Sequence, residues 1–97
     1  MDFKTYYETE RKKLFHKETL NESELAELIN FMEVSKDLME KSIADENFDE
    51  WDYPELKSKK ADDYAAEICD FTISFHMDDR EIVEFDDEII NYLKGRS

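Results

Sequence analysis

Carboxylates are the side chains that occur in this sequence in numbers and at spacings able to support recognition chemistry. Residues 78–88 hold seven acids and one base. The acids that recur at spacings of three or four are Asp63, Glu67 and Asp70 and, further along, Glu81, Glu84 and Glu88. On a helix such neighbours lie about 5 to 6 Å apart on one face, a distance comparable with the step between phosphates of a nucleic-acid strand. Rows of this kind could imitate a phosphate backbone.

The same rows have a plainer interpretation. Every amphipathic helix needs a polar face, and an acidic face gives solubility without any partner. Like charges at these spacings weaken a helix slightly, and few bases are interleaved among the acids of residues 78–88. A partner-directed face and simple solvation therefore both stay open.

Residues able to bind a metal or to catalyse a reaction are few. His16, His76 and Cys69 lack the spacing of a zinc site. We expect Cys69 to be a small core residue and His76 to lie at a helix end or on the surface. The acid-rich stretches lack the central glycine and the ligand spacing of a calcium-binding loop, and a chain with one glycine cannot form a phosphate-binding loop. We expect no catalytic residue, no metal site and no cofactor, and hence no enzyme.

Aromatic residues are interspersed in the acidic stretch 45–53, which reads DENFDEWDY. Phe48 and Trp51 could pack over the core in an ordered loop. Alternatively, exposed aromatics could anchor a partner while the carboxylates attract its basic surface. Of the three rings, we expect that of Tyr53 to be the most exposed.

Composition limits the class of protein and of partner. The 97 residues, 40% of them hydrophobic, suit one folded domain spanning 1–97. A formal net charge of -14 repels nucleic acid and anionic membranes and attracts basic proteins. The lone cysteine, the lack of a leader pattern and the lack of a long apolar run predict a soluble cytoplasmic protein.

Helix starts are indicated by a repeated phrase: an apolar residue, Asp or Asn, two variable positions, Glu, and an apolar residue. It occurs in the ranges 20–25, 51–56 and 77–82. In each, the Asp or Asn can cap a helix and the Glu can complete a capping box. Helices are also favoured because one Gly and one Pro supply few tight turns.

The predicted helices cover about 3–17, 22–44, a third region entered from Trp51 and continuing to about 75, and 79–94. The third region is ambiguous, because residues 69–77 also alternate between apolar and polar as a strand does. Asp86 is the one acid on the apolar side of the last helix. The fold class is therefore predicted to be all-α, a compact bundle of about four helices. The alternative is an α+β fold with a β-hairpin near 69–85.

In size, acidity and lack of catalytic groups, the chain resembles the broad class of small acidic inhibitor proteins. This class includes phage-encoded anti-restriction and anti-CRISPR proteins, DNA mimics, and immunity proteins of nuclease toxins. The resemblance implies a protein that occludes the basic surface of a nuclease, CRISPR effector or DNA-binding protein, with no direct contact to nucleic acid. The alternative is a non-catalytic adaptor or homodimerisation domain that uses an apolar helix face. The candidate partner-binding residues are Asp45, Glu46, Asp49, Glu50, Tyr53, Asp63, Glu67, Asp70, Asp78, Asp79, Glu81, Glu84, Asp87 and Glu88.

Overall fold

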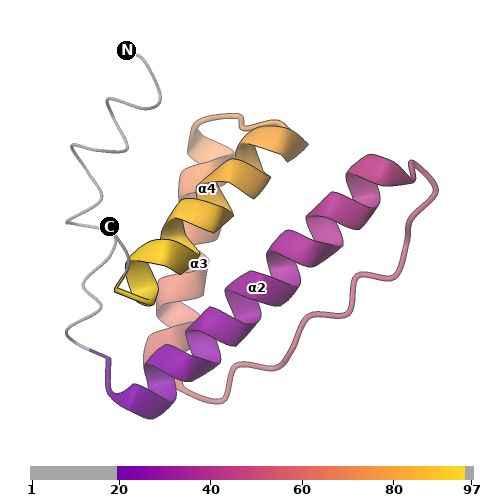
Figure 1. The fold of residues 1–97 in the computed structure, drawn as a ribbon. Coiled ribbons are helices and arrows are strands. Elements are labelled where there is room, and N and C mark those ends of the chain that lie inside the picture. The colour runs from indigo at the N-terminus through magenta and orange to yellow at the C-terminus, as the bar shows by residue number, and fades with distance from the viewer. Residues whose placement is uncertain (1–19, 96–97) are drawn as a thin grey trace.

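The computed structural model of the chain describes residues 20–95, and helices are the regular secondary structure found in this part of the chain (Figure 1). Three helices follow one another: α2 spans Glu22–Ala44, α3 spans Lys59–Ser74 and α4 spans Asp79–Leu93. The all-α class is thus confirmed over this part of the chain. The helix predicted over residues 3–17 lies outside the described residues, so the count of four stays a prediction.

Two helix starts lie where the sequence phrase predicts them. At the beginning of α2, the Glu24 N–H donates to Asn21 Oδ1 at 2.8 Å, and the Asn21 N–H donates to Glu24 Oε1 at 2.9 Å. At the beginning of α4, the Glu81 N–H donates to Asp78 Oδ1 at 2.9 Å, and the Asp78 N–H donates to Glu81 Oε1 at 3.4 Å. Both are complete capping boxes, which satisfy N–H groups that a helix end otherwise leaves without partners.

The predicted helix start within residues 51–56 is wrong, because α3 begins only after its N-cap, Ser58. The Ser58 hydroxyl accepts from the Ala61 N–H at 3.3 Å. One physical reason is Pro54: a proline disfavours helical backbone angles in the preceding residue, and a helix capped by Asp52 would need Tyr53 to be helical.

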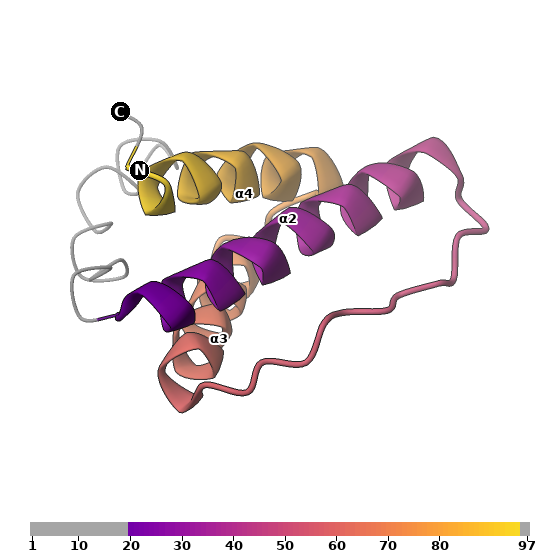
Figure 2. The same cartoon turned by 60° about the horizontal axis from the view of Figure 1, so that its bottom comes forward.

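A second reason is the distance that the connection between α2 and α3 must cover. It returns from the end of α2 to the level of Glu27, whose side chain accepts from the Ser58 N–H. At a rise of 1.5 Å per residue, the stretch of α2 from Glu27 to Ala44 is about 26 Å long. Residues 45–51 could reach at most about 25 Å, whereas residues 45–58 reach far enough, and Figure 2 shows this long connection running back beside α2.

The ambiguous region 69–77 is helical as far as Ser74, so the helix prediction is confirmed and the hairpin alternative is wrong within residues 20–95. The apolar positions of α3 that enter the core follow the helical period and not the strand period. Phe71 packs against Phe75 and Phe85, with ring centroids 4.7 and 4.9 Å apart. In contrast, Ile73, which strand alternation would bury together with Phe71, is 65% exposed.

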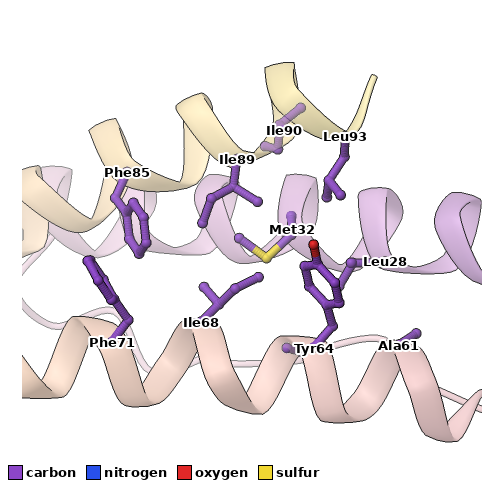
Figure 3. Close-up of a cluster of buried hydrophobic side chains, with 11 residues drawn as sticks. Leu28, Met32, Ala61, Tyr64, Ile68, Phe71, Phe85, Ile89, Ile90 and Leu93 are labelled. Carbon is purple, nitrogen blue, oxygen red and sulfur yellow. The ribbon is translucent and has the colours of Figure 1, made fainter. Parts of the chain in front are cut away.

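The core lies where the three helices meet. α2 packs mainly against α4 and to a smaller extent against α3, and α3 and α4 run in roughly opposite directions (Figures 1 and 2). Figure 3 shows the buried side chains of α3 and α4 facing one another, with those of α2 alongside. The core cluster comprises Leu28, Met32, Ala61, Tyr64, Ala65, Ile68, Phe71, Phe85, Ile89, Ile90 and Leu93. Full burial of a side chain the size of Leu, Ile or Phe contributes about 1.5 to 3 kcal/mol to the free energy of folding. The packing of this cluster therefore fixes the three helices relative to one another.

Candidate functional site

The connection between α2 and α3 is held to α2 by a chain of stacked aromatic rings. Phe48 meets Trp51 edge to face at 5.1 Å, and Trp51 stacks on Tyr53 at 6.5 Å. Tyr53 in turn stacks on Phe31 of α2 at 5.6 Å. Tyr53 is the most exposed of the three rings of the connection, as predicted, at 45% against 39% for Trp51. Packing and exposure thus coexist in this segment.

The far end of the connection is fastened by two carboxylates of α2. Glu27 Oε1 accepts from the backbone N–H groups of Lys57 and Ser58. The Ser58 hydroxyl donates to Glu24 Oε2 at 3.1 Å. The pKa of Glu24 is lowered, chiefly because its carboxylate also accepts the Asn21 N–H. Acids that the sequence presents as surface charge therefore position the start of α3.

Between the three helices and this connection lies a cavity of about 390 Å³. Its walls are mostly apolar, and side chains from every described element contribute to it. The lining residues are Phe31, Met32, Ser35 and Met39 of α2, Tyr53 of the connection, Ala65, Ile68, Cys69 and Thr72 of α3, and Ile82 and Asp86 of α4. A volume of this size lies within the range of about 300 to 1,000 Å³ that is usual for small-molecule sites.

Asp86 is the one charged residue that lines the cavity among residues 20–95. Its side chain is buried, with 2% of the residue exposed, and within residues 20–95 its Oδ2 atom has no hydrogen-bond partner. Desolvation raises the pKa of this carboxyl to about 7, and the charge of nearby Lys36 acts in the opposite direction. Its place on the apolar side of α4 was visible in the helical period, but the cavity around it was not.

Tyr53 is the residue of the connection that lines the cavity. Burial is the main cause that raises the pKa of its phenol, and the nearby charge of Asp86 adds to the rise. A hydrogen bond to Ser35 acts in the opposite direction. Tyr53, Ser35 and Asp86 thus bring three polar groups from separate elements to one largely apolar space. The sequence indicated the exposure of Tyr53 but not its position in the wall of this cavity.

The predicted partner-binding acids are divided by the structure into two groups. Asp78 and Glu81 close the capping box of α4, Asp45 accepts from the Asn47 N–H at 3.0 Å, and Asp87 accepts from Lys36 at 2.9 Å. The others are exposed carboxylates: Glu46, Asp49 and Glu50 on the connection, Asp63, Glu67 and Asp70 on α3, and Asp79, Glu84 and Glu88 on α4. The row proposed for α4 therefore lacks its first member, Glu81, whose carboxylate serves the helix start.

The exposed acids of α3 and α4 belong to a region with little compensating charge. Residues 61–93 contain eleven acids and one base, Arg80. Among the described residues, two lysines of α2 form salt bridges, Lys36 with Asp87 and Lys41 with Asp37. Asp63, Glu67 and Asp70 follow one another at helical spacings on the outer face of α3. This row is the longest exposed one among the predicted acids.

Cys69 and His76 were also singled out from the sequence. The expectation that Cys69 is a small core residue is wrong, because its side chain is exposed at the edge of the cavity. His76 is exposed in the turn that follows α3, as predicted for a residue at a helix end. Within residues 20–95, no group of three or more His, Cys, Asp or Glu side chains is arranged to hold a metal ion.

Comparisons of the chain with protein-family models, curated proteins and solved structures found no match. Among the described helices, none combines the length and the apolar character that crossing a membrane requires.

Proposed function

We propose that this protein is a small acidic binding protein that occludes the basic, nucleic-acid-binding surface of a nuclease, CRISPR effector or DNA-binding protein. The observation that supports the proposal is the exposed row Asp63, Glu67 and Asp70, within a region of eleven acids and one base. A rigid helix holds these carboxylates at a spacing close to that of phosphates. Long-range attraction from a net charge of -14 would accelerate encounter with a basic partner.

The capping residues of α4 narrow the contact surface. Because Asp78 and Glu81 hold each other's backbone N–H groups, their carboxylates are already engaged at the start of the helix. We place the main contact on the outer face of α3, where all three carboxylates are exposed, and extend it to the exposed Glu84 and Glu88 on α4. Glu46, Asp49 and Glu50 of the connection contribute to the attraction of the partner.

The experiment compares two charge-matched variants as baits. One carries Asp63→Asn, Glu67→Gln and Asp70→Asn on the proposed face. The control carries Glu22→Gln, Asp37→Asn and Glu40→Gln. These substitutions replace three exposed acids of α2 and change the net charge by the same three units. Each bait and the wild type are used to capture proteins from host lysate for mass spectrometry.

The proposal expects a nucleic-acid-binding protein that the wild type and the α2 control capture and that the α3 variant loses. Capture should weaken steeply between low and moderate salt, because exposed charges are screened beyond about 10 Å at 0.1 M ionic strength. Addition of the captured protein's own nucleic acid should also displace the bait. A captured protein without a basic surface, or equal capture by the α3 variant, would overturn the proposal.

An adaptor or homodimerisation domain is the second candidate, and one observation favours it. Ile73 of α3 is 65% exposed, and the partly exposed rings of Trp51 and Tyr53 add further apolar surface. Association through such surface depends little on salt, unlike association through carboxylates. Ile73→Lys should abolish it, while the α3 amide variant should leave it intact.

A further inference from the structure

The cavity beside Asp86 has the composition of a ligand site. Ligand sites are concave and mostly apolar, with a small number of polar groups that fix the orientation of the ligand. Here the apolar walls come from residues such as Met32, Ile68 and Ile82, and a single carboxyl supplies the charge. The space is bounded on one side by Tyr53, which the aromatic stacking on Phe31 holds in place.

The burial of Asp86 is costly for the fold in the absence of a hydrogen-bond donor. A buried polar atom without a partner is destabilising, and such atoms are rare in folded proteins. Among the described residues, Oδ2 of Asp86 is such a buried atom without a partner. The residue lies on the face of α4 that otherwise packs apolar side chains into the core. A donor from outside the protein would complement this acceptor.

The charges around Asp86 indicate a cationic donor. Lys36 of α2 is the nearby base, but its Nζ donates to the adjacent Asp87 and does not line the cavity. In the part of the chain that the structure describes, the other titratable groups that face this space are the hydroxyl of Tyr53 on the connection and the thiol of Cys69 on α3. Neither supplies a positive charge, and the negative field of the whole chain favours a cation further.

We propose that this cavity binds a small amphipathic amine, with its ammonium group paired to the carboxyl of Asp86 and its apolar body against the walls formed by Met32, Ile68 and Ile82. The site differs from the acidic face of the proposed function, because Asp86 is buried and the acids of that face are exposed. Failure of either proposal therefore leaves the other standing.

The probes are three molecules that share a phenyl body: 2-phenylethylamine, 2-phenylethanol and 3-phenylpropanoate. Each is titrated into the full chain at pH 8, and binding is followed by the backbone amide resonances of residues that line the cavity. The amine should bind at least about tenfold more tightly than the alcohol, since a hydrogen bond to a charged buried group is stronger than a neutral one. The propanoate should bind most weakly because its charge repels that of Asp86.

Asp86→Asn tests whether the carboxyl makes the distinction. In this variant the amine should bind no more tightly than the alcohol, while the affinity for the alcohol stays within about threefold of the wild type. Asp37→Asn removes an exposed carboxylate of α2 that does not line the cavity, and it should keep the full preference for the amine. At pH 5 the wild type should lose most of its preference, because the carboxyl is then protonated.

Several outcomes would overturn the proposal. The first is equal binding of amine and alcohol to the wild type, and the second is an undiminished preference in Asp86→Asn. The third is that none of the probes shifts the resonances of the cavity residues at millimolar concentration. Resonance shifts confined to the exposed acids of α3 and α4 would show surface attraction of the amine and would equally reject the cavity site.

Discussion

Lys36 reaches across the interface between α2 and α4 and donates to Oδ1 of Asp87 at 2.9 Å, whereas Asp86 next to it remains buried without a donor to Oδ2 within residues 20–95. Two adjacent carboxyls of one helix thus have opposite environments. The hydrogen bond with Asp87 is the main cause that raises the pKa of Lys36. Asp86 instead has its pKa raised to about 7 by desolvation.

Asp86→Asn is expected to stabilise the protein in a way that depends on pH. The folded state binds the Asp86 proton more tightly than the unfolded state. Below the ordinary pKa of 3.8 the carboxyl is protonated in both states, so its ionisation does not lower the free energy of unfolding. Its cost grows as the pH rises from there through about 7. The variant should therefore exceed the wild type by about 2 to 4 kcal/mol in free energy of unfolding at pH 8, and match it near pH 4.

Urea unfolding of both proteins over this pH range measures the difference in their free energies of unfolding. The contributions of the other carboxylates cancel in this difference, because both proteins contain them. Asp37→Asn is the control, because its exposed carboxyl pairs with Lys41 on the surface. It should change stability by no more than about 0.5 kcal/mol at either pH. A constant offset between Asp86→Asn and the wild type from pH 4 to pH 8 would contradict the assignment.

Lys36→Met is expected to raise the pKa of Asp86 further. The positive charge of Lys36 is the influence that opposes desolvation at this carboxyl, so its removal leaves desolvation uncompensated. The measurement is a titration of the Asp86 carboxyl carbon by NMR in both proteins. Lys41→Met, which removes a lysine paired with Asp37 on the same helix, should leave the Asp86 titration unchanged.

The start of α3 gives a direct comparison of two candidate caps. Ser58→Ala should lower the free energy of unfolding by about 1 kcal/mol, because the Ala61 N–H loses its acceptor and Glu24 loses the donor at 3.1 Å. Asp52→Ala should change it by less than about 0.5 kcal/mol, since Asp52 precedes no helix. Thermal or urea unfolding of the two variants distinguishes them. A larger loss from Asp52→Ala would place the helix start where the sequence phrase predicts it.

What the sequence could predict was decided by local interactions. The capping boxes at Asn21 and Asp78 are formed by residues three positions apart, so their pattern is visible in the sequence. Ser58 has no Glu three positions later, and the carboxylates beside it come from Glu24 and Glu27 of another helix. The same limit applies to the cavity. The helical spacing of apolar residues in α4 shows that Asp86 lies on the apolar side of this helix. The cavity beside Asp86 is formed by α2, α3 and the connection, which are distant in the sequence.

The turn after α3 carries a residue whose backbone is unfavourable for its type. His76 has a φ of 51°, in the left-handed region that costs a residue other than glycine about 1 kcal/mol or more. It occupies the C′ position of a Schellman motif, in which the His76 N–H donates to Ile73 O at 3.0 Å and the Met77 N–H donates to Thr72 O at 3.2 Å. Gly95, with a φ of 78°, has the equivalent position after α4.

His76→Gly should therefore raise the free energy of unfolding by about 0.5 to 1 kcal/mol, because relief of the left-handed strain exceeds the extra entropy of glycine in the unfolded chain. Gly95→Ala should lower it by a similar amount, since it introduces at Gly95 the strain that His76 now carries. His76→Ala serves as the control for loss of the imidazole, and it should stay within about 0.5 kcal/mol of the wild type. Urea unfolding at one pH measures all three. If His76→Gly and His76→Ala shifted stability equally, the imidazole and not the backbone would be the source of the effect.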